Sequence, residues 1–336
     1  MKTENYRIYQ IPVAIMLFML ILDAQTAILG AAEAVDLCIR TVIPSLFPFI
    51  FISGFFRMIW QNATNPILKL LGKLCKLPTG SENLFLLGII GGYPVGAKCV
   101  YDSYCDKTID YNSANRILCF CNNAGPAFII GIVGSLFERD SLSICIWGIQ
   151  ILSAIIVGAV LPAKNAANTN EPQVKKTSIT ILLQNAIRAV ANICGWVIIF
   201  RVLLVVLNKW VLWLLPDYLQ VILAGTLELT NGILMLSIIS SPYLQFIFAN
   251  IFLSLGGLCI ALQTKSMAPI FDYTDYYIGK LLQASICLIL SSVIGFIYFP
   301  GNNLIICTIS IVTGIITALI FYHFLKRTGK MQRVDV

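Results

Sequence analysis

Long apolar runs dominate this chain and restrict what it can fold into. Many of them reach or approach the roughly 20 residues that an α-helix needs to cross a bilayer. Only 12% of the 336 residues are charged, about half the share usual in a soluble domain. These features predict an all-α polytopic membrane protein, and they exclude a soluble enzyme, a disordered chain and a nucleic-acid binder. The apolar segments are 11–29, 42–60, 84–100, 117–137, 142–162, 179–207, 210–227, 232–262, 281–299 and 303–325.

Basic residues account for the net charge of +7 and gather between or after the apolar runs. Loops rich in lysine and arginine stay in the cytoplasm when a membrane protein is inserted. We therefore predict that residues 62–82, the linker 163–178 and the C-terminal tail are cytoplasmic, with a polybasic binding site as the alternative. The residues concerned are Lys69, Lys73, Lys76, Lys164, Lys175, Lys176, Lys326, Arg327, Lys330 and Arg333.

The residues that usually bind metals or act as catalytic nucleophiles and bases are either few in this sequence or not spaced as such sites require. The eleven cysteines form no C-x-x-C pair, and His323 is the single histidine. The sequence also contains neither an H-E-x-x-H helix nor a P-loop. We therefore expect no metal, no cofactor and no enzymatic activity, and we interpret the cysteines as small apolar residues in helix contacts.

Several apolar segments do not have the pattern of simple membrane spans. Residues 30–43 carry three charges on one helical face and indicate an interfacial helix. Ser240-Ser241-Pro242 interrupts the long segment 232–262, since proline cannot donate a helical hydrogen bond. Two crossings must separate the cytoplasmic loops 62–82 and 163–178, although three apolar segments lie between them. We predict that 84–100, which is rich in glycine and proline, enters and leaves on the same side.

The two halves of the chain share three sequence blocks in the same order. The amphipathic stretch that leads into residues 44–49 parallels the stretch 182–195, together with the residues that follow that stretch. Residues 88–96 parallel 225–232, and residues 122–126 parallel 254–257. Interrupted hydrophobic segments at matching positions of two halves are typical of the binding site of a transporter.

The first glycine-rich break provides the first group of candidate binding residues. Gly92, Tyr93 and Pro94 lie at the break, where the N–H groups of a half-helix N-terminus can bind an anion. Lys98 follows one turn later and would add a full positive charge. The alternative is that Lys98 extends to the lipid headgroups.

The other breaks provide amides and one acid. Asn122 and Asn123, before Gly125, could bind polar substrate atoms or could cap the broken helix. Glu228 lies in a neutral apolar run, so it is a candidate for H⁺ or Na⁺ coupling. The alternative for Glu228 is a structural ion pair with Arg188 or Arg201. Gln263 could donate to a substrate or could begin the next loop.

At these residues the chain resembles a known family. The strings Pro-Ser-Leu-Phe-Pro-Phe (44–49), Gly-Gly-Tyr-Pro-Val-Gly-Ala-Lys (91–98) and Cys-Asn-Asn-Ala-Gly-Pro-Ala-Phe (121–128) resemble the YlbJ-like sporulation integral membrane proteins. Two strings of the second half do so as well, Glu-Leu-Thr-Asn-Gly (228–232) and Ser-Leu-Gly-Gly-Leu-Cys-Ile-Ala-Leu-Gln (254–263).

The resemblance implies two "Gate" domains for nucleoside recognition, similar to parts of concentrative nucleoside transporters. Their broken or re-entrant helices would form two inverted repeats. It also implies movement of dipicolinate across the mother-cell (outer forespore) membrane during sporulation. Transport of nucleosides or another small solute, and a scaffold role without transport, are the alternatives. The expected partners are a small-molecule substrate and the lipid bilayer, without nucleic acid, and a homo-oligomer is left open.

The expected organisation follows from these features. It comprises an N-terminal transmembrane helix (1–30), a first repeat (31–162), a polar cytoplasmic linker (163–178), a second repeat (179–280), C-terminal transmembrane helices (281–325) and a basic cytoplasmic tail (326–336).

Overall fold

The regular elements of this protein are α-helices with short π and 3₁₀ turns. The computed structural model describes residues 14, 17–59, 66–78, 80–137, 140–163, 178–299 and 304–331, and no β-strand occurs among them. Seven helices of this described part are long and apolar enough to cross a membrane, which confirms an all-helical polytopic architecture. They cover Ala24–Phe56, Tyr111–Phe137, Ser141–Val160, Ile179–Trp210, Pro242–Met267, Tyr273–Tyr298 and Leu304–Lys326.

The N-terminal helices form one continuous run, which differs from the expected arrangement. Helix α2 (Ala24–Leu37) passes through the π-turn η1 (Cys38–Val42) into α3 (Ile43–Ile59). The sequence indicated two separate segments joined by an interfacial helix over 30–43. Instead, two of the charges within 30–43 pair with each other, Arg40 with Asp36 at 2.5 Å, and Glu33 pairs with Arg201 at 2.7 Å. Pro44 has no N–H to donate, and the wider π-turn directly precedes it.

The first half continues with a short helix, a helical hairpin, a broken helix and an unbroken helix. The short helix is α4 (Pro66–Leu74), and the hairpin is α5 (Glu82–Gly91) with α6 (Val95–Cys105). The broken helix consists of α7 (Tyr111–Cys121), α8 (Pro126–Phe128), the π-turn η2 (Ile129–Val133) and α9 (Gly134–Phe137), and the unbroken helix is α10 (Asp140–Val160).

The second half contains the same types of element. The long α11 (Ile179–Trp210) and the turn η3 (Leu212–Leu214) lead into a hairpin of α12 (Asp217–Leu227), α13 (Leu229–Met235) and η4 (Leu236–Ile238). A broken helix of α14 (Pro242–Leu255) and α15 (Gly257–Met267) follows, and then α16 (Tyr273–Tyr298) and α17 (Leu304–Met331).

The helix breaks fall where the glycine and proline pattern predicts them. Gly92 and Gly256 have φ angles of +73° and +75°, a backbone conformation that is strained for other residues. Pro242 begins α14, and the hydroxyl of Ser241 accepts from Leu244 N at 3.4 Å as an N-cap. The break expected within 232–262 is therefore confirmed, and a second one at Gly256 divides α14 from α15.

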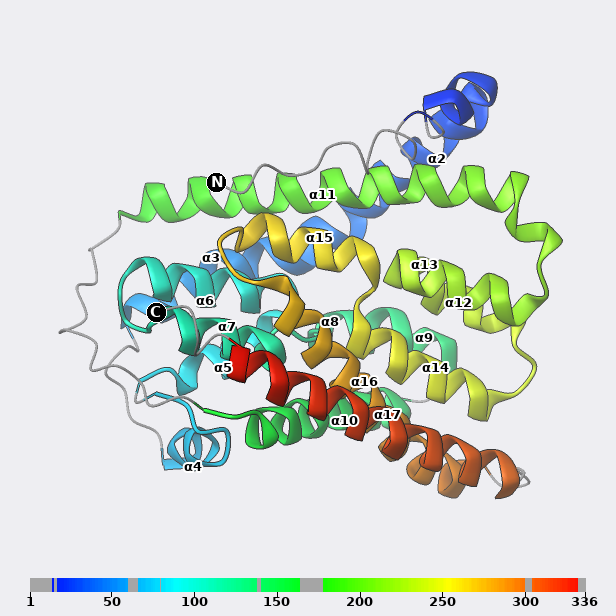
Figure 1. The fold of residues 1–336 in the computed structure, drawn as a ribbon. Coiled ribbons are helices and arrows are strands. Elements are labelled where there is room, and N and C mark those ends of the chain that lie inside the picture. The colour runs from blue at the N-terminus through cyan, green and yellow to red at the C-terminus, as the bar shows by residue number, and fades with distance from the viewer. Residues whose placement is uncertain are drawn as a thin grey trace.

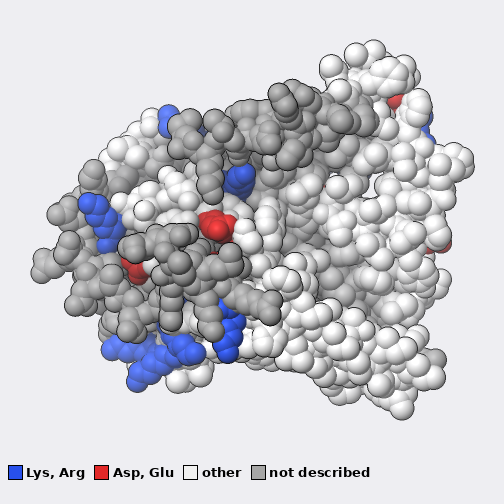
Figure 2. Space-filling model, in the orientation of Figure 1, with Lys and Arg blue, Asp and Glu red and all other residues white. Residues whose placement is uncertain are grey.

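Most of the long helices run roughly along one axis, which lies horizontally in Figure 1, whereas α2 and α4 are steeply inclined to it. The hairpin α5–α6 points inward from the left end, and the hairpin α12–α13 points inward from the right end. Helix α4, the start of α11 and the end of α17 lie toward the left, where most of the lysine and arginine visible in Figure 2 also gathers. Apart from its end residues 163 and 178, the expected linker lies outside the described residues, as do 1–13 and 332–336.

Candidate functional site

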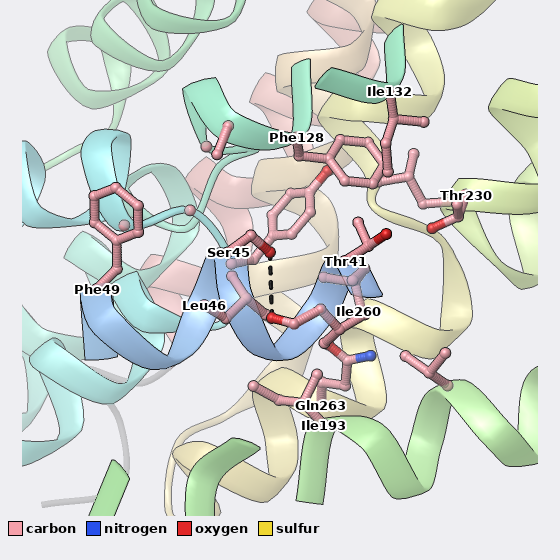
Figure 3. Close-up of a pocket in the computed structure, with 18 of the residues that line it drawn as sticks. Thr41, Ser45, Leu46, Phe49, Phe128, Ile132, Ile193, Thr230, Ile260 and Gln263 are labelled. Carbon is pink, nitrogen blue, oxygen red and sulfur yellow. Dashed lines mark hydrogen bonds between the residues drawn. The ribbon is translucent and has the colours of Figure 1, made fainter. Parts of the chain in front are cut away.

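A cavity of about 80 Å³ lies where the tips of the two hairpins approach each other. Ile90 to Tyr93 of the first hairpin and Glu228 to Thr230 of the second line it, together with residues of both broken helices. In Figure 3, Thr41 of η1 and Thr230 of α13 turn their hydroxyl groups toward each other across this space, and Gln263 reaches it from α15. We call it the central cavity. Of the candidate binding and coupling residues, it contains Gly92, Tyr93, Gly125, Glu228 and Gln263.

The tip of the first hairpin is held against both broken helices. A Cβ atom built on Gly92 would lie 2.8 Å from the backbone nitrogen of Gly125, so only glycine allows this approach. The hydroxyl of Tyr93 donates to Leu253 O on α14 at 3.1 Å. Pro94 begins the second arm of the hairpin as the N-cap of α6, and it is not among the residues that line the central cavity. The tip is thus fixed by contacts with both halves of the chain.

The two adjacent asparagines are buried beside the central cavity and serve the helix break. The amide of Asn122 donates to Thr264 Oγ1 at 2.9 Å and to Tyr276 Oη at 3.3 Å. The amide of Asn123 donates to Phe120 O at 2.7 Å, one of the carbonyls freed where α7 ends. The capping alternative therefore describes Asn123 in this structure, whereas Asn122 links the break to α15 and α16.

A buried cation lies behind these asparagines, and the sequence reasoning missed it. Lys280 of α16 is 3% exposed. Its ammonium donates to Asn122 O, to Asn123 Oδ1 at 3.2 Å and to Gln283 Oε1 at 3.0 Å. The signal in the sequence is the spacing of Lys280, Gln283 and Cys287, which places three polar or polarisable side chains on one helical face.

Glu228 is the N-cap of α13 at the tip of the second hairpin. Its carboxylate accepts from Thr230 N at 3.0 Å, from Asn231 N at 2.8 Å and from Asn231 Nδ2 at 2.7 Å. Arg201 of α11 donates to Asn231 Oδ1 and pairs with Glu33 of α2. Arg201 is therefore linked to Glu228 through Asn231, while Arg188 is exposed to the surroundings. Glu228 is only 4% exposed and also lines the central cavity.

Lys98 belongs to a different cavity. It lies beside α3 and α11 in a space of about 230 Å³, which Ser53, Asn185 and Asp102 also line. The Lys98 ammonium pairs with Asp102 at 2.9 Å, four residues along the same helix. We call this space the second cavity. The structure therefore separates Lys98 from the central cavity, although the sequence motif grouped them.

Comparisons with known proteins give one informative similarity. The chain is 24% identical over 295 residues to the sporulation integral membrane protein YlbJ of Bacillus subtilis (strain 168). The alignment covers 73% of this chain and 71% of that protein. No family model and no solved structure matches the chain. The seven apolar helices indicate a multi-pass membrane protein. The name of the relative describes an integral membrane protein of sporulation and no enzymatic activity.

Proposed function

We propose that this protein is a membrane transporter for a small polar metabolite. The observation that carries the proposal is the meeting of two hairpin tips and two broken helices around one central cavity. Interrupted helices inside a membrane survive where they line a cavity or are buried in protein. In transporters they form the substrate site between two repeats, and the movement of one repeat against the other gives alternating access. A scaffold role would leave this arrangement without a purpose.

The two halves are proposed to be inverted Gate-type repeats, over 31–162 and 179–280. In each hairpin two glycines face each other, Gly88 with Gly96 and Gly225 with Gly232. The contacts between the halves are also reciprocal: α6 packs on α15, and α13 packs on the turn η2 that follows α8.

Two glutamines extend this reciprocity into the polar core. Gln150 of α10 donates to Asn250 O of the second broken helix at 3.0 Å. Gln283 of α16 donates to Asn123 Oδ1 of the first broken helix at 2.8 Å. Each half of the chain therefore supplies a glutamine to the broken helix of the other, Gln150 from within the first repeat and Gln283 from just after the end of the second. A reciprocal exchange of this kind supports two repeats around a pseudo-two-fold axis.

The first substrate to test is dipicolinate, a planar dianion with a ring nitrogen. The family resemblance implies this molecule, and the similarity to a sporulation protein is consistent with it. The ammonium of Lys280 lies behind the central cavity and not in its lining, and its three hydrogen bonds go to uncharged oxygens. It therefore favours an anion only through the field of its unpaired positive charge.

A second candidate class is an uncharged polar solute such as a nucleoside, and Glu228 favours it. Among the described residues that line the central cavity, Glu228 is the one with a charged side chain. Its carboxylate also takes up the N–H groups at the start of α13. A negative group at a helix N-terminus offsets the positive end of the helix dipole, so this end of the cavity suits a hydroxyl-bearing solute better than an anion.

Uptake into liposomes tests the proposed function and separates the two candidates. Purified full-length protein should accumulate radiolabelled dipicolinate above empty liposomes, and unlabelled dipicolinate should compete better than uridine or adenosine. Stronger competition by the nucleosides would assign the site to the uncharged class. Absence of uptake for every solute tested, with protein shown to be folded, would contradict a transporter and leave the scaffold role.

Orientation in the membrane gives a separate prediction. Cys105 is the one exposed cysteine of the eleven and lies at the end of α6, toward the lysine-rich end of the molecule. If that end is cytoplasmic, a membrane-impermeant maleimide should label Cys105 in inverted vesicles and not in intact cells. A variant that combines Cys105→Ser with Trp213→Cys, in the exposed turn η3 at the opposite end, should show the reverse. Labelling of Cys105 from outside would overturn the orientation.

A further inference from the structure

The ammonium of Lys280 occupies an unusual position in a membrane helix. Lys280 lies in α16, within a segment apolar enough to span a bilayer. A charged group in such a place is costly, and it persists where it has a function and a set of partners. Its side chain points at the gap between α7 and α8, where Asn122 and Asn123 leave the helical conformation.

The hydrogen-bond acceptors around the Lys280 ammonium are equal in number to its donors. A lysine ammonium has three N–H donors and no acceptor. Here one donor goes to the backbone oxygen of Asn122, one to Asn123 Oδ1 and one to Gln283 Oε1. All three acceptors are neutral carbonyl or amide oxygens, so they solvate a positive charge without forming an ion pair.

Neutral oxygens at a helix break are also the ligands of coupling ions. In secondary transporters, freed backbone carbonyls and the C-terminal ends of half-helices coordinate Na⁺. Asn122 directly follows the C-terminal end of α7, and its backbone oxygen is the kind of ligand that such a site uses. Three buried amide oxygens lack a hydrogen-bond partner among the described residues, and two of them belong to residues bonded to this cluster, Asn122 Oδ1 and Gln150 Oε1. The local surroundings are therefore rich in cation ligands.

We propose that the Lys280 ammonium is a built-in cation that fills the ion site at the α7–α8 break. Because the charge is tethered to α16, the break needs no exchangeable Na⁺ for its stability. One consequence rests on the proposed transport function. Because no Na⁺ binds at the α7–α8 break, a Na⁺ gradient does not drive substrate movement through this site. Lys280 also holds α16 of the second half against the broken helix of the first half, as Gln283 does beside it.

Thermal unfolding of the purified full-length protein tests this proposal without any substrate. Wild-type protein should unfold at the same temperature, within about 1 °C, in NaCl, KCl and choline chloride at equal ionic strength. Lys280→Ala should lower the unfolding temperature by roughly 5 °C or more, because it leaves buried acceptors without a donor. Added Na⁺ or propylammonium, which replaces the deleted atoms, should restore part of the loss. Lys69→Ala, at an exposed position of α4, should change neither the unfolding temperature nor its salt dependence.

The proposal has two clear ways to fail. A saturable stabilisation of wild-type protein by Na⁺ over choline would show an exchangeable ion and overturn it, and this measurement needs no variant. Lys280→Met keeps the length of the side chain without the charge, so unchanged stability of that variant in choline chloride would also overturn it. Failure of uptake in liposomes would contradict the transport proposal alone, since the salt measurements do not depend on transport.

Discussion

Gly88→Ala should remove nearly all folded protein from the membrane, although it adds a single methyl group. A Cβ atom at Gly88 of α5 would overlap the backbone oxygen of Cys121, the last residue of α7. The same oxygen lies 2.6 Å from the position of a Cβ on Gly96 of α6, so the two arms of the hairpin enclose it. A backbone oxygen cannot rotate away as a side chain can. We expect a cost above roughly 3 kcal/mol, at the upper end of overpacking effects.

The chain offers a matched control for this prediction. Gly148 lies in α10, also within a membrane-spanning helix, and a Cβ there would meet nothing within 4 Å. Gly148→Ala should leave the protein unchanged or slightly more stable, because alanine favours a helix over glycine by up to about 1 kcal/mol. Fluorescence size-exclusion chromatography of detergent extracts measures the amount of folded protein for both variants. Equal amounts of monodisperse Gly88→Ala and wild-type protein would show that the hairpin does not seat on α7 in this way.

Glu228→Gln should strongly reduce concentrative uptake while the protein still folds. The amide keeps one oxygen that can accept from the start of α13, so we expect a loss of cap stability of only about 1 kcal/mol. The carboxylate charge inside the central cavity is lost completely. A hydrogen bond from a bound substrate or ion to this charged carboxylate is worth roughly 1.5–3 kcal/mol. Its loss should therefore lower uptake against a gradient ten- to a hundredfold. If Glu228 couples transport to an ion, exchange of labelled for unlabelled substrate should remain measurable.

Asp110→Asn separates loss of the cap from loss of function. Asp110 caps α7 with the same chemistry, accepting from Asn112 N at 2.9 Å and from Ser113 N at 3.0 Å. It does not line the central cavity. Its variant should therefore lose a similar amount of stability and keep normal uptake. If both variants transport normally, Glu228 acts as a cap and the coupling role is wrong.

The breaks in the helices were predictable because their causes are local. Clustered glycines, or a proline after two serines, weaken a helix locally, so the breaks near Gly92, Pro242 and Gly256 could be located from the sequence. A single glycine or proline is tolerated, as Pro48 in α3 and Gly148 in α10 show. The continuous run from Ala24 to Ile59 could not, because one of the three charges that suggested an interfacial helix finds its partner only in the fold. Glu33 pairs with Arg201, which lies 168 residues away in the sequence.

The candidate site was predictable only in part, and for the same reason. Five of its residues lie in motifs at the breaks and line the central cavity. Lys98 stands in the same motif as Gly92, yet the helix that begins at Val95 carries its side chain to the second cavity. Lys280 stands at the edge of an apolar run, where a lysine usually extends to the headgroups. Gln283 on the same helical face is a local signal, but the other two partners, Asn122 and Asn123, lie more than 150 residues away in the sequence.

The bond between Lys280 and Asn122 also has a consequence for biosynthesis. The two residues are 158 positions apart, and ribosomes add roughly 5–20 residues per second. The broken helix α7–α9 therefore waits roughly 8–32 s in the membrane before the lysine that completes it has been made. During that interval the exposed carbonyl needs water, lipid headgroups or the insertion machinery as a temporary partner. Chains truncated before α16 should consequently be substrates for membrane quality control, even though they contain both hairpins.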